Sequence, residues 1–217
     1  MSLLQRTSTV DELVESVTEQ ILLGRLAPGT RLREAEFARR YDVSRNTLRE
    51  ALHRLARDGL VVHRPHRGAT VARPTRDDVH DIFRIRRVLE VAGCGTIDEA
   101  GAREMARTAR RMETAAAGRD WARLVDLDFD FHARLVSSLG SPKLNEFFGS
   151  LLRELRLSFV LIDSAPGGMT VPSHVPDHAR IATGLVDGRK EAAAERLTAH
   201  LRDAETLVID HLAEERR

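Results

Sequence analysis

The spacing of apolar residues predicts a compact group of helices and strands in the first third of the chain. Apolar side chains recur there every three or four residues in three segments, and they alternate with polar ones in two shorter segments. The first kind covers residues 9–24, 33–41 and 45–58, and the second covers 60–64 and 69–73. Recurrence at helical spacing predicts amphipathic helices, whereas alternation predicts strands. We therefore expect three helices followed by a small β-hairpin.

The third of these helices has clear limits. Asp42-Val43 forms a tight turn before it, and the hydroxyl of Ser44 can accept hydrogen bonds from the free N–H groups at its start. Gly59 ends the helix, and Pro65–Gly68 forms the tip of the hairpin that follows. A helix, a tight turn, a capped second helix and a hairpin in this order are typical of a winged helix-turn-helix, in which the hairpin is the wing.

The remainder of the chain carries helical patterns throughout. Six run at about 75–99, 101–117, 120–139, 142–163, 174–187 and 189–215, with glycine or proline at most of the breaks. Thr75 and Asp78 have the spacing of a capping box at the start of the first, directly after the break at Arg73-Pro74. The sequence thus predicts a mostly α-helical protein. Residues 1–74 would form a winged helix-turn-helix, and residues 75–217 an all-α bundle of six or seven helices.

Charge is distributed unevenly between these two parts. From Arg25 to Arg73 there are 12 arginines and 5 acidic residues, a net charge of +7 in a chain whose total is +1, while residues 75–217 sum to −3. Arg45 and Arg49 lie one turn apart near the start of the third helix, away from its apolar stripe. Arginine in that position can bond guanine through two parallel hydrogen bonds. We therefore expect the first domain, and not the second, to bind DNA.

The composition is that of a soluble globular protein. Hydrophobic residues make up 42% and charged residues 31% of the chain, with no apolar stretch of 18 residues and no pattern of signal-peptide type. The single cysteine, Cys94, lies among apolar residues and is most simply a small core residue, so neither a disulfide nor a catalytic thiol is expected. We expect a cytoplasmic protein with no membrane partner.

One group of residues in the second domain could bind a metal ion. Asp128 and His132 are four residues apart, so on a helix they share a face and lie one turn from each other. His178 and His200 lie on apolar faces of later helices, where a buried imidazole needs a polar partner. Spacing alone leaves two interpretations open: a metal site, or hydrogen-bonded histidines in the core.

The segment from Gly24 to Val71 also resembles the N-terminal domain of GntR-superfamily transcriptional regulators. Its most specific parts are Val43-Ser44-Arg45 and Leu48-Arg49-Glu50-Ala51-Leu52. A further operator-contacting arginine found in some members aligns with Ala35, so Arg33 or Arg39 would have to replace it. The DNA-contacting residues implied by the resemblance are Arg33, Ser44, Arg45, Thr47, Arg49, His66, Arg67 and Gly68.

Residues 75–212 resemble the FCD ligand-binding domain of the fatty-acid-responsive (FadR) branch of the same family. The matching motifs are Arg86-x-x-Leu89-Glu90, Asp128-x-x-x-His132, Ser141-Pro-Lys-Leu144 and a closing pattern from His178 to His200-Leu201. By this resemblance the ligands of one divalent cation are Asp128, His132, His178 and His200. His174, one helical turn before His178, is the rival for that position. Zinc is the expected ion, with nickel, manganese and iron as alternatives.

A set of one carboxylate and three imidazoles leaves one or two coordination positions open. In a sensor these positions would bind the carboxylate of a small effector, which Arg86 could clamp, with Arg156 as a second candidate. Arg86 could instead pair with Glu90, four residues further on. In a hydrolase they would hold a water, but Asp130 would point to another face of its helix and could not serve as the general base.

The sequence therefore predicts a ligand-responsive, homodimeric transcription factor that is not an enzyme. Members of the family are most often repressors, and a symmetric dimer implies a palindromic double-stranded DNA operator. Two alternatives belong to other classes. One is a metal-dependent hydrolase fused to a DNA-binding domain, and the other is an architectural DNA-binding protein with a purely structural metal.

Overall fold

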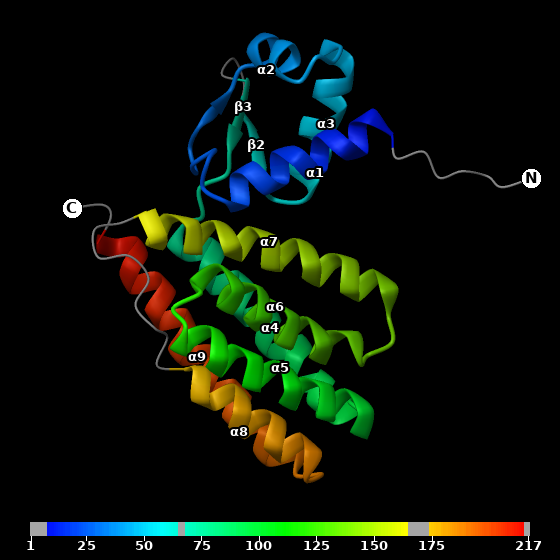
Figure 1. The fold of residues 1–217 in the computed structure, drawn as a ribbon, viewed down its shortest axis with the longest axis vertical. Helices are drawn as coiled ribbons and strands as arrows, with labels where there is room; N and C mark the ends of the chain where they lie inside the picture. The colour runs from blue at the N-terminus through cyan, green and yellow to red at the C-terminus, as the bar shows by residue number, and fades with distance from the viewer. Residues whose placement is uncertain (1–7, 65–67, 165–173, 215–217) are drawn as a thin grey trace, which may run out of the picture. The chain divides into compact units, whose positions relative to one another are not determined.

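The computed structural model describes residues 8–64, 68–164 and 174–214. The chain divides into two compact units (Figure 1). The first consists of Met1–Pro74 and Arg153–Ser164, and the second of Thr75–Leu152 and Ala165–Arg217. The domain bounds 1–74 and 75–217 stay a prediction.

Three helices and a three-stranded sheet make up most of the N-terminal unit. The elements are α1 (Thr9–Leu22), β1 (Arg31–Leu32), α2 (Glu34–Arg40), α3 (Arg45–Arg57), β2 (Val61–Arg64) and β3 (Gly68–Val71). Strand β3 is central and pairs antiparallel with both neighbours, so that Val71 lies opposite Val61 and Thr70 opposite Arg31. The winged helix-turn-helix is confirmed. Strand β1 joins the predicted hairpin, and with two residues it is too short for an alternating pattern to reveal it.

Local sequence explains where the reading helix α3 begins and ends. The Ser44 hydroxyl accepts a hydrogen bond from the Thr47 N–H at 3.0 Å, which satisfies a free donor at the helix start. Gly59 follows the last residues of α3 with φ of +71°, a conformation that favours glycine and stops the helix. Leu48, Leu52 and Leu55 are fully buried in the core of this unit. The opposite side of α3 is therefore turned to solvent.

Helices form the described part of the C-terminal unit, as predicted. They are α4 (Arg76–Thr96), α5 (Glu99–Ala117), α6 (Trp121–Ser137), α8 (Val175–Val186), α9 (Lys190–Glu214) and the part of α7 (Pro142–Ser164) that precedes Arg153. Thr75 and Asp78 form the predicted capping box at the start of α4, each side chain bonding the other residue's backbone N–H. Among the described residues, no helix has the length and apolar character needed to cross a membrane.

Five of these helices form a closed ring around a common interior. Helix α4 packs against α6 and α9, α5 packs against α6 and α8, and α8 packs against α9. The approach of α4 and α6 depends on Gly93, because a Cβ at that position would lie 2.1 Å from the carbonyl oxygen of Leu135. This close packing sets α4 beside the face of α6 that carries the predicted metal ligands.

Candidate metal centre and DNA-reading helix

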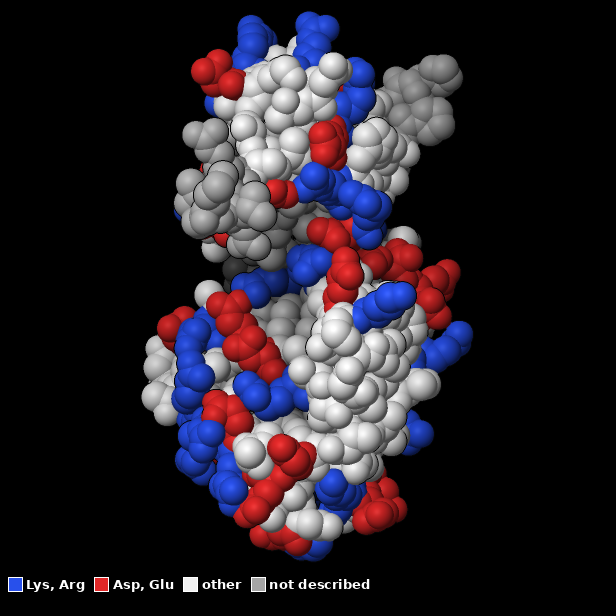
Figure 2. All heavy atoms as spheres, turned by 90° about the vertical axis from the view of Figure 1, so that its right-hand side faces the viewer, with Lys and Arg blue, Asp and Glu red and all other residues white. Residues whose placement is uncertain are grey.

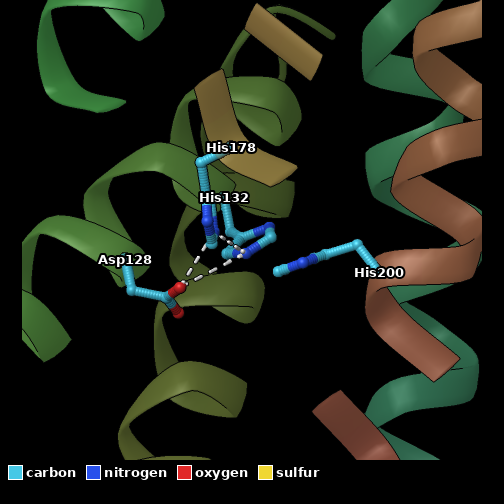
Figure 3. A group of neighbouring side chains, drawn as sticks. All are labelled: Asp128, His132, His178 and His200. Atoms are coloured by element: carbon cyan, nitrogen blue, oxygen red, sulfur yellow. Dashed lines mark hydrogen bonds and ion pairs between the residues drawn. The ribbon is translucent and has the colours of Figure 1, made fainter. Parts of the chain in front are cut away.

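The ring of helices brings all four predicted metal ligands together. Asp128 and His132 come from α6, His178 from α8 and His200 from α9, and each offers a ligand atom within 4.8 Å of the others (Figure 3). The three histidines are almost completely buried, while the Asp128 side chain is 26% exposed. Figure 3 shows the rings of His132 and His178 beside the Asp128 carboxylate, with the ring of His200 reaching toward them from α9.

Hydrogen bonds fix the orientation of two of these rings. The Nδ1 of His132 lies 2.6 Å from Oε2 of the buried Glu90, and the Nδ1 of His178 lies 3.2 Å from the backbone carbonyl oxygen of His174. A carboxylate and a carbonyl can only accept, so both Nδ1 atoms carry the hydrogen. In the neutral rings this leaves each Nε2 with a bare lone pair. In known metal sites, a carboxylate or carbonyl outside the coordination shell orients a ligand histidine in the same way, by accepting a hydrogen bond from its other ring nitrogen.

The bare Nε2 atoms converge on one point with a carboxylate oxygen. The Nε2 atoms of His132 and His178 are 3.3 Å apart. Oδ1 of Asp128 lies 3.0 Å from Nε2 of His178 and 3.8 Å from Nε2 of His132. Ligands about 2.0–2.1 Å from a tetrahedral zinc ion would be roughly 3.3 Å from one another. When both rings are neutral, three electron-rich atoms at this spacing repel one another unless a cation lies between them, so the donor set fits a divalent metal.

His200 completes the set from the opposite side. Its ring centroid is 4.4 Å from that of His178 and 5.4 Å from that of His132. Its Nδ1 is buried and has no hydrogen-bond partner among the described residues. An unsatisfied buried nitrogen is costly in a folded protein, and coordination of an ion by the ring would compensate for that cost.

The electrostatics of the cluster favour the protonation states that bind metal. Burial lowers the pKa of His132 and holds that of His200 well below its ordinary value, so these imidazoles are neutral near pH 7. Burial opposes ionisation of Asp128 and Glu90, but neighbouring histidines and Arg86 outweigh it and lower the pKa of both carboxyls. Neutral imidazoles and ionised carboxylates are the forms that coordinate cations and orient their ligands.

Arg86 occupies a buried position beside this cluster. Its Nε donates to Oε1 of Glu90 at 2.7 Å, so the ion pair that the sequence left as an alternative is present. Its guanidinium also stacks over the ring of Phe83 with the Cζ atom 4.9 Å from the centroid. However, its Nη2 is buried without a hydrogen-bond partner among the described residues. Arg86 therefore supports Glu90 and still has donors for a further anion.

The second effector candidate and the possible general base lie elsewhere. Arg156 is half-buried in the segment Arg153–Ser164 of α7, which belongs to the N-terminal unit, so its role as an effector ligand stays a prediction. Asp130 is exposed on α6, whereas Asp128 faces the cluster. A water bound at the metal ligands would therefore lack the Asp130 carboxylate as a base.

The orienting role of Glu90 is the main feature that the sequence analysis missed. Glu90 was considered only as an ion-pair partner of Arg86, yet its carboxylate joins Arg86 to His132. The available signal was its place on α4: Val79, Phe83, Arg86 and Glu90 follow one another at helical spacing along the buried face. A carboxylate at such a position requires buried partners.

On α3 the predicted DNA-contacting residues lie at the surface. Arg45 is exposed at the first position of the helix. Arg49 is also exposed, but its Nη2 lies 2.9 Å from Oε2 of Glu34 on α2, so it must release or share that carboxylate to reach a base. The hydroxyls of Ser44 and Thr47 lie 2.8 Å apart at the start of the helix. Figure 2 shows basic side chains, in blue, at the surface of this unit.

The remaining predicted contacts are on α2 and the wing. Arg33 is exposed at the residue before α2, and Arg39 is exposed with its Nε donating to the carbonyl oxygen of Ala35 at 3.2 Å. Gly68 opens β3 with φ of +76°, a left-handed conformation that suits the turn of the wing. His66 and Arg67 lie outside the described residues.

Comparison with known proteins decides the family. The family model described as bacterial regulatory proteins of the gntR family matches residues 9–71, and the model of the FCD domain matches residues 81–203. The chain belongs to the GntR family. It is thus a GntR transcriptional regulator with an FCD domain, and not an enzyme.

Relatives of this GntR regulator match it along nearly its whole length. The HTH-type transcriptional regulator YdhC of Bacillus subtilis is 28% identical over 94% of this chain and 92% of its own. A protein of Paenarthrobacter nicotinovorans named as the probable D-xylose utilization operon transcriptional repressor is 26% identical over 91% of this chain and 88% of its own. The crystal structure of a GntR regulator from Rhodococcus sp. RHA1 is 32% identical, with a TM-score of 0.80 over 93% of this chain and 97% of that one.

Proposed function

We propose that this GntR regulator is a repressor released from its operator by a small carboxylate effector, which binds at a divalent metal centre inside the FCD domain. The observation that carries the proposal is the convergence of the Nε2 atoms of His132 and His178 with Oδ1 of Asp128, at separations of 3.0–3.8 Å. Hydrogen bonds from both Nδ1 atoms turn the second nitrogen of each ring, the one that can bind a cation when the ring is neutral, toward this point.

The four ligands would be Asp128, His132, His178 and His200. Their imidazole-rich composition suits zinc, and nickel, manganese or iron(II) would also accept it. When bound, the ion supplies positive charge that attracts an anionic ligand to its open positions. The chain's own residues hold the ligands in place: Glu90 orients His132, and the backbone carbonyl of His174 orients His178.

A carboxylate is the effector class that suits the surroundings of this centre. The Nη2 of Arg86 is a buried donor without a partner among the described residues, and planar guanidinium groups bind carboxylates with two aligned hydrogen bonds. One oxygen of an effector carboxylate would meet the metal's open position while the other accepts from Nη2. Arg156 is the second candidate for this contact.

DNA binding by the family is established, and the operator would be palindromic if the protein acts as a homodimer. Helix α4 supports the dimer, because Ile85, Val88 and Ala92 line one side of it and Val88 is 66% exposed. A second copy packing on this apolar side would remove it from water. Repression is supported by the D-xylose relative, whose name describes a repressor.

An architectural DNA-binding protein with a structural metal remains the alternative. The unpartnered Nη2 of Arg86 disfavours it, because a purely structural centre has no need of a buried free donor beside it.

Three measurements on the purified protein test the proposal. Elemental analysis should find close to one equivalent of divalent metal per chain, and His132→Ala should lose it. Small carboxylic acids would then be screened by thermal shift, and those that stabilise the metal-loaded protein would be added to an operator titration followed by fluorescence anisotropy. A usual coupling of about 1–3 kcal/mol would weaken operator binding about 5- to 150-fold. If none of the stabilising acids changes the operator affinity, the architectural alternative is favoured.

A further inference from the structure

A second group of possible metal ligands shares a residue with the centre described above. His174, Asp177 and His200 each offer a ligand atom within 4.8 Å of the other two. The His174 ring lies edge-on to that of His200, with centroids 5.8 Å apart, while His178 approaches His200 at 4.4 Å. His200 therefore lies between two sets of ligands.

The histidines of the two sets differ in their access to solvent. His132, His178 and His200 are almost completely buried, whereas His174 is partly exposed, and the two carboxylates are similar, with the Asp128 side chain 26% and the Asp177 side chain 18% exposed. His174 occupies the N-cap position of α8, and Asp177 lies in the first turn of the same helix. His174 thus offers a partly exposed imidazole next to the buried ring of His200.

The outer set is also built to bind weakly. Oδ1 of Asp177 accepts from Arg180 at 3.1 Å and from Arg196 at 2.9 Å, and the two guanidinium groups offset its negative charge. Asp128, by contrast, pairs with histidine nitrogens, the Nε2 atoms of His132 and His178, and His200 completes its set. A cation would therefore be held more tightly by the inner set than by the outer one.

We propose that His174, Asp177 and His200 form a loading site through which the divalent cation reaches the buried centre. The proposal rests on the metal centre of the proposed function. His200 belongs to both sets, and its neutral ring has one bare nitrogen, so it would bind one ion at a time and the sets would act in sequence. His174 and Asp177 would replace some of the cation's waters, and His178, His132 and Asp128 would then take over from these outer ligands, with His200 common to both sets.

The backbone links the two sets as well. The carbonyl oxygen of His174 accepts the hydrogen bond that orients the His178 ring. Replacing the His174 side chain leaves that carbonyl in place, so His174→Ala removes the outer imidazole without removing the support of the inner one. This separation makes the rate of loading and the final affinity independently measurable.

The experiment follows uptake of Co²⁺ by metal-free protein in a stopped-flow spectrometer, using the visible absorption that Co²⁺ gains with nitrogen ligands. His174→Ala and Asp177→Asn are expected to slow uptake at least about tenfold and to reach the same final spectrum and one equivalent of cobalt. Arg196→Gln, which frees Asp177 from one partner, is expected to speed uptake. The matched control is His80→Ala, which removes a half-exposed histidine of α4 that pairs with Glu205.

The possible outcomes distinguish failure of the loading site from failure of the metal centre itself. Circular dichroism first confirms that every variant is folded. Uptake by His174→Ala at the parent rate would overturn the proposal and point to loading past the part-exposed Asp128. A final cobalt content well below one equivalent in His174→Ala would overturn it too, by making His174 a permanent ligand. A parent protein that takes up no cobalt, zinc or nickel would instead refute the metal centre itself, and the loading site with it.

Discussion

The two units of this GntR regulator place their functional side chains in opposite settings. On α3 the buried face is apolar, and Arg45 and Arg49 lie on the exposed face, outside the core. In the FCD domain the ionisable residues lie inside: Arg86, Glu90 and three histidines are almost completely buried. The surface proposed to read DNA can therefore change with little effect on folding, whereas the proposed effector site is part of the structure that holds its domain together.

The difference fits what each unit is proposed to recognise. DNA is too large to enclose, so its readers must project from a surface. A small ligand can be surrounded, and the low polarity of the surroundings then strengthens each charged contact. Burial also has an energetic cost, because without a ligand the site holds charged groups whose desolvation is offset only by their pairing with one another.

The largest effect that separates the two settings is expected for Glu90→Ala. This change removes the carboxylate that pairs with Arg86 and orients His132, and it leaves a buried arginine without an anion. Loss of one partner of a buried ion pair costs about 3–5 kcal/mol, which urea unfolding of the metal-free protein would measure. Glu50→Ala, which removes a carboxylate from the exposed pair with Arg54, is the control and should cost at most about 1 kcal/mol. Equal costs for the two variants would contradict the contrast.

Metal removal is expected to have the next largest effect, and only through the FCD domain. Bound metal at 100 to 1,000 times its dissociation constant would stabilise the folded state by about 2.7–4.1 kcal/mol. A chelator should therefore lower the melting temperature of the parent protein and leave that of His132→Ala unchanged. If the chelator lowers both melting temperatures equally, the stabilising ion lies outside this cluster.

The same contrast explains how much of the fold and of the candidate site could be predicted from the sequence. Helical spacing, Ser44, the Thr75–Asp78 box and the Asp128–His132 pair depend on residues close together in the chain, and the structure contains the elements and caps that they predict. Glu90 acts through His132, a partner 42 residues away on α6. No local pattern reports such a contact, because it depends on how α4 and α6 pack.

Arg49 shows the same limit at the level of a single side chain. Its position along α3 was predictable, but Glu34 on α2 pairs with it, and only the packing of α2 on α3 makes that acid relevant. The pair of Arg86 with Glu90 lies within one helix, and the sequence offered it as an alternative.

A medium-sized effect, confined to DNA, is expected for Arg45→Ala. If this exposed arginine reads a base edge, its loss should cost about 1–3 kcal/mol on the specific operator and leave the melting temperature unchanged. The control is Arg57→Ala, which removes an exposed arginine from the other end of α3. Competition binding with operator and random DNA distinguishes a contact to a base from a contact to a phosphate. A loss that is the same on both DNAs would make Arg45 a phosphate contact.

The smallest expected effect is on effector binding in the FCD domain. Its test requires a variant that keeps the charge pairing between residue 86 and Glu90. Arg86→Ala is unsuitable, because it would leave Glu90 buried without its cation and disturb His132. Arg86→Lys retains a positive charge for Glu90 but lacks the second guanidinium nitrogen that the effector carboxylate is proposed to bind. We expect about one equivalent of metal and an operator affinity near that of the parent protein, together with a roughly tenfold higher effector concentration for release, which corresponds to about 1.4 kcal/mol. The measurement is an operator titration by fluorescence anisotropy across effector concentrations, with Arg84→Lys on the exposed side of α4 as the control. An effector response in Arg86→Lys that matches the control would exclude Arg86 as the carboxylate ligand, and Arg156→Lys would then be the variant to titrate.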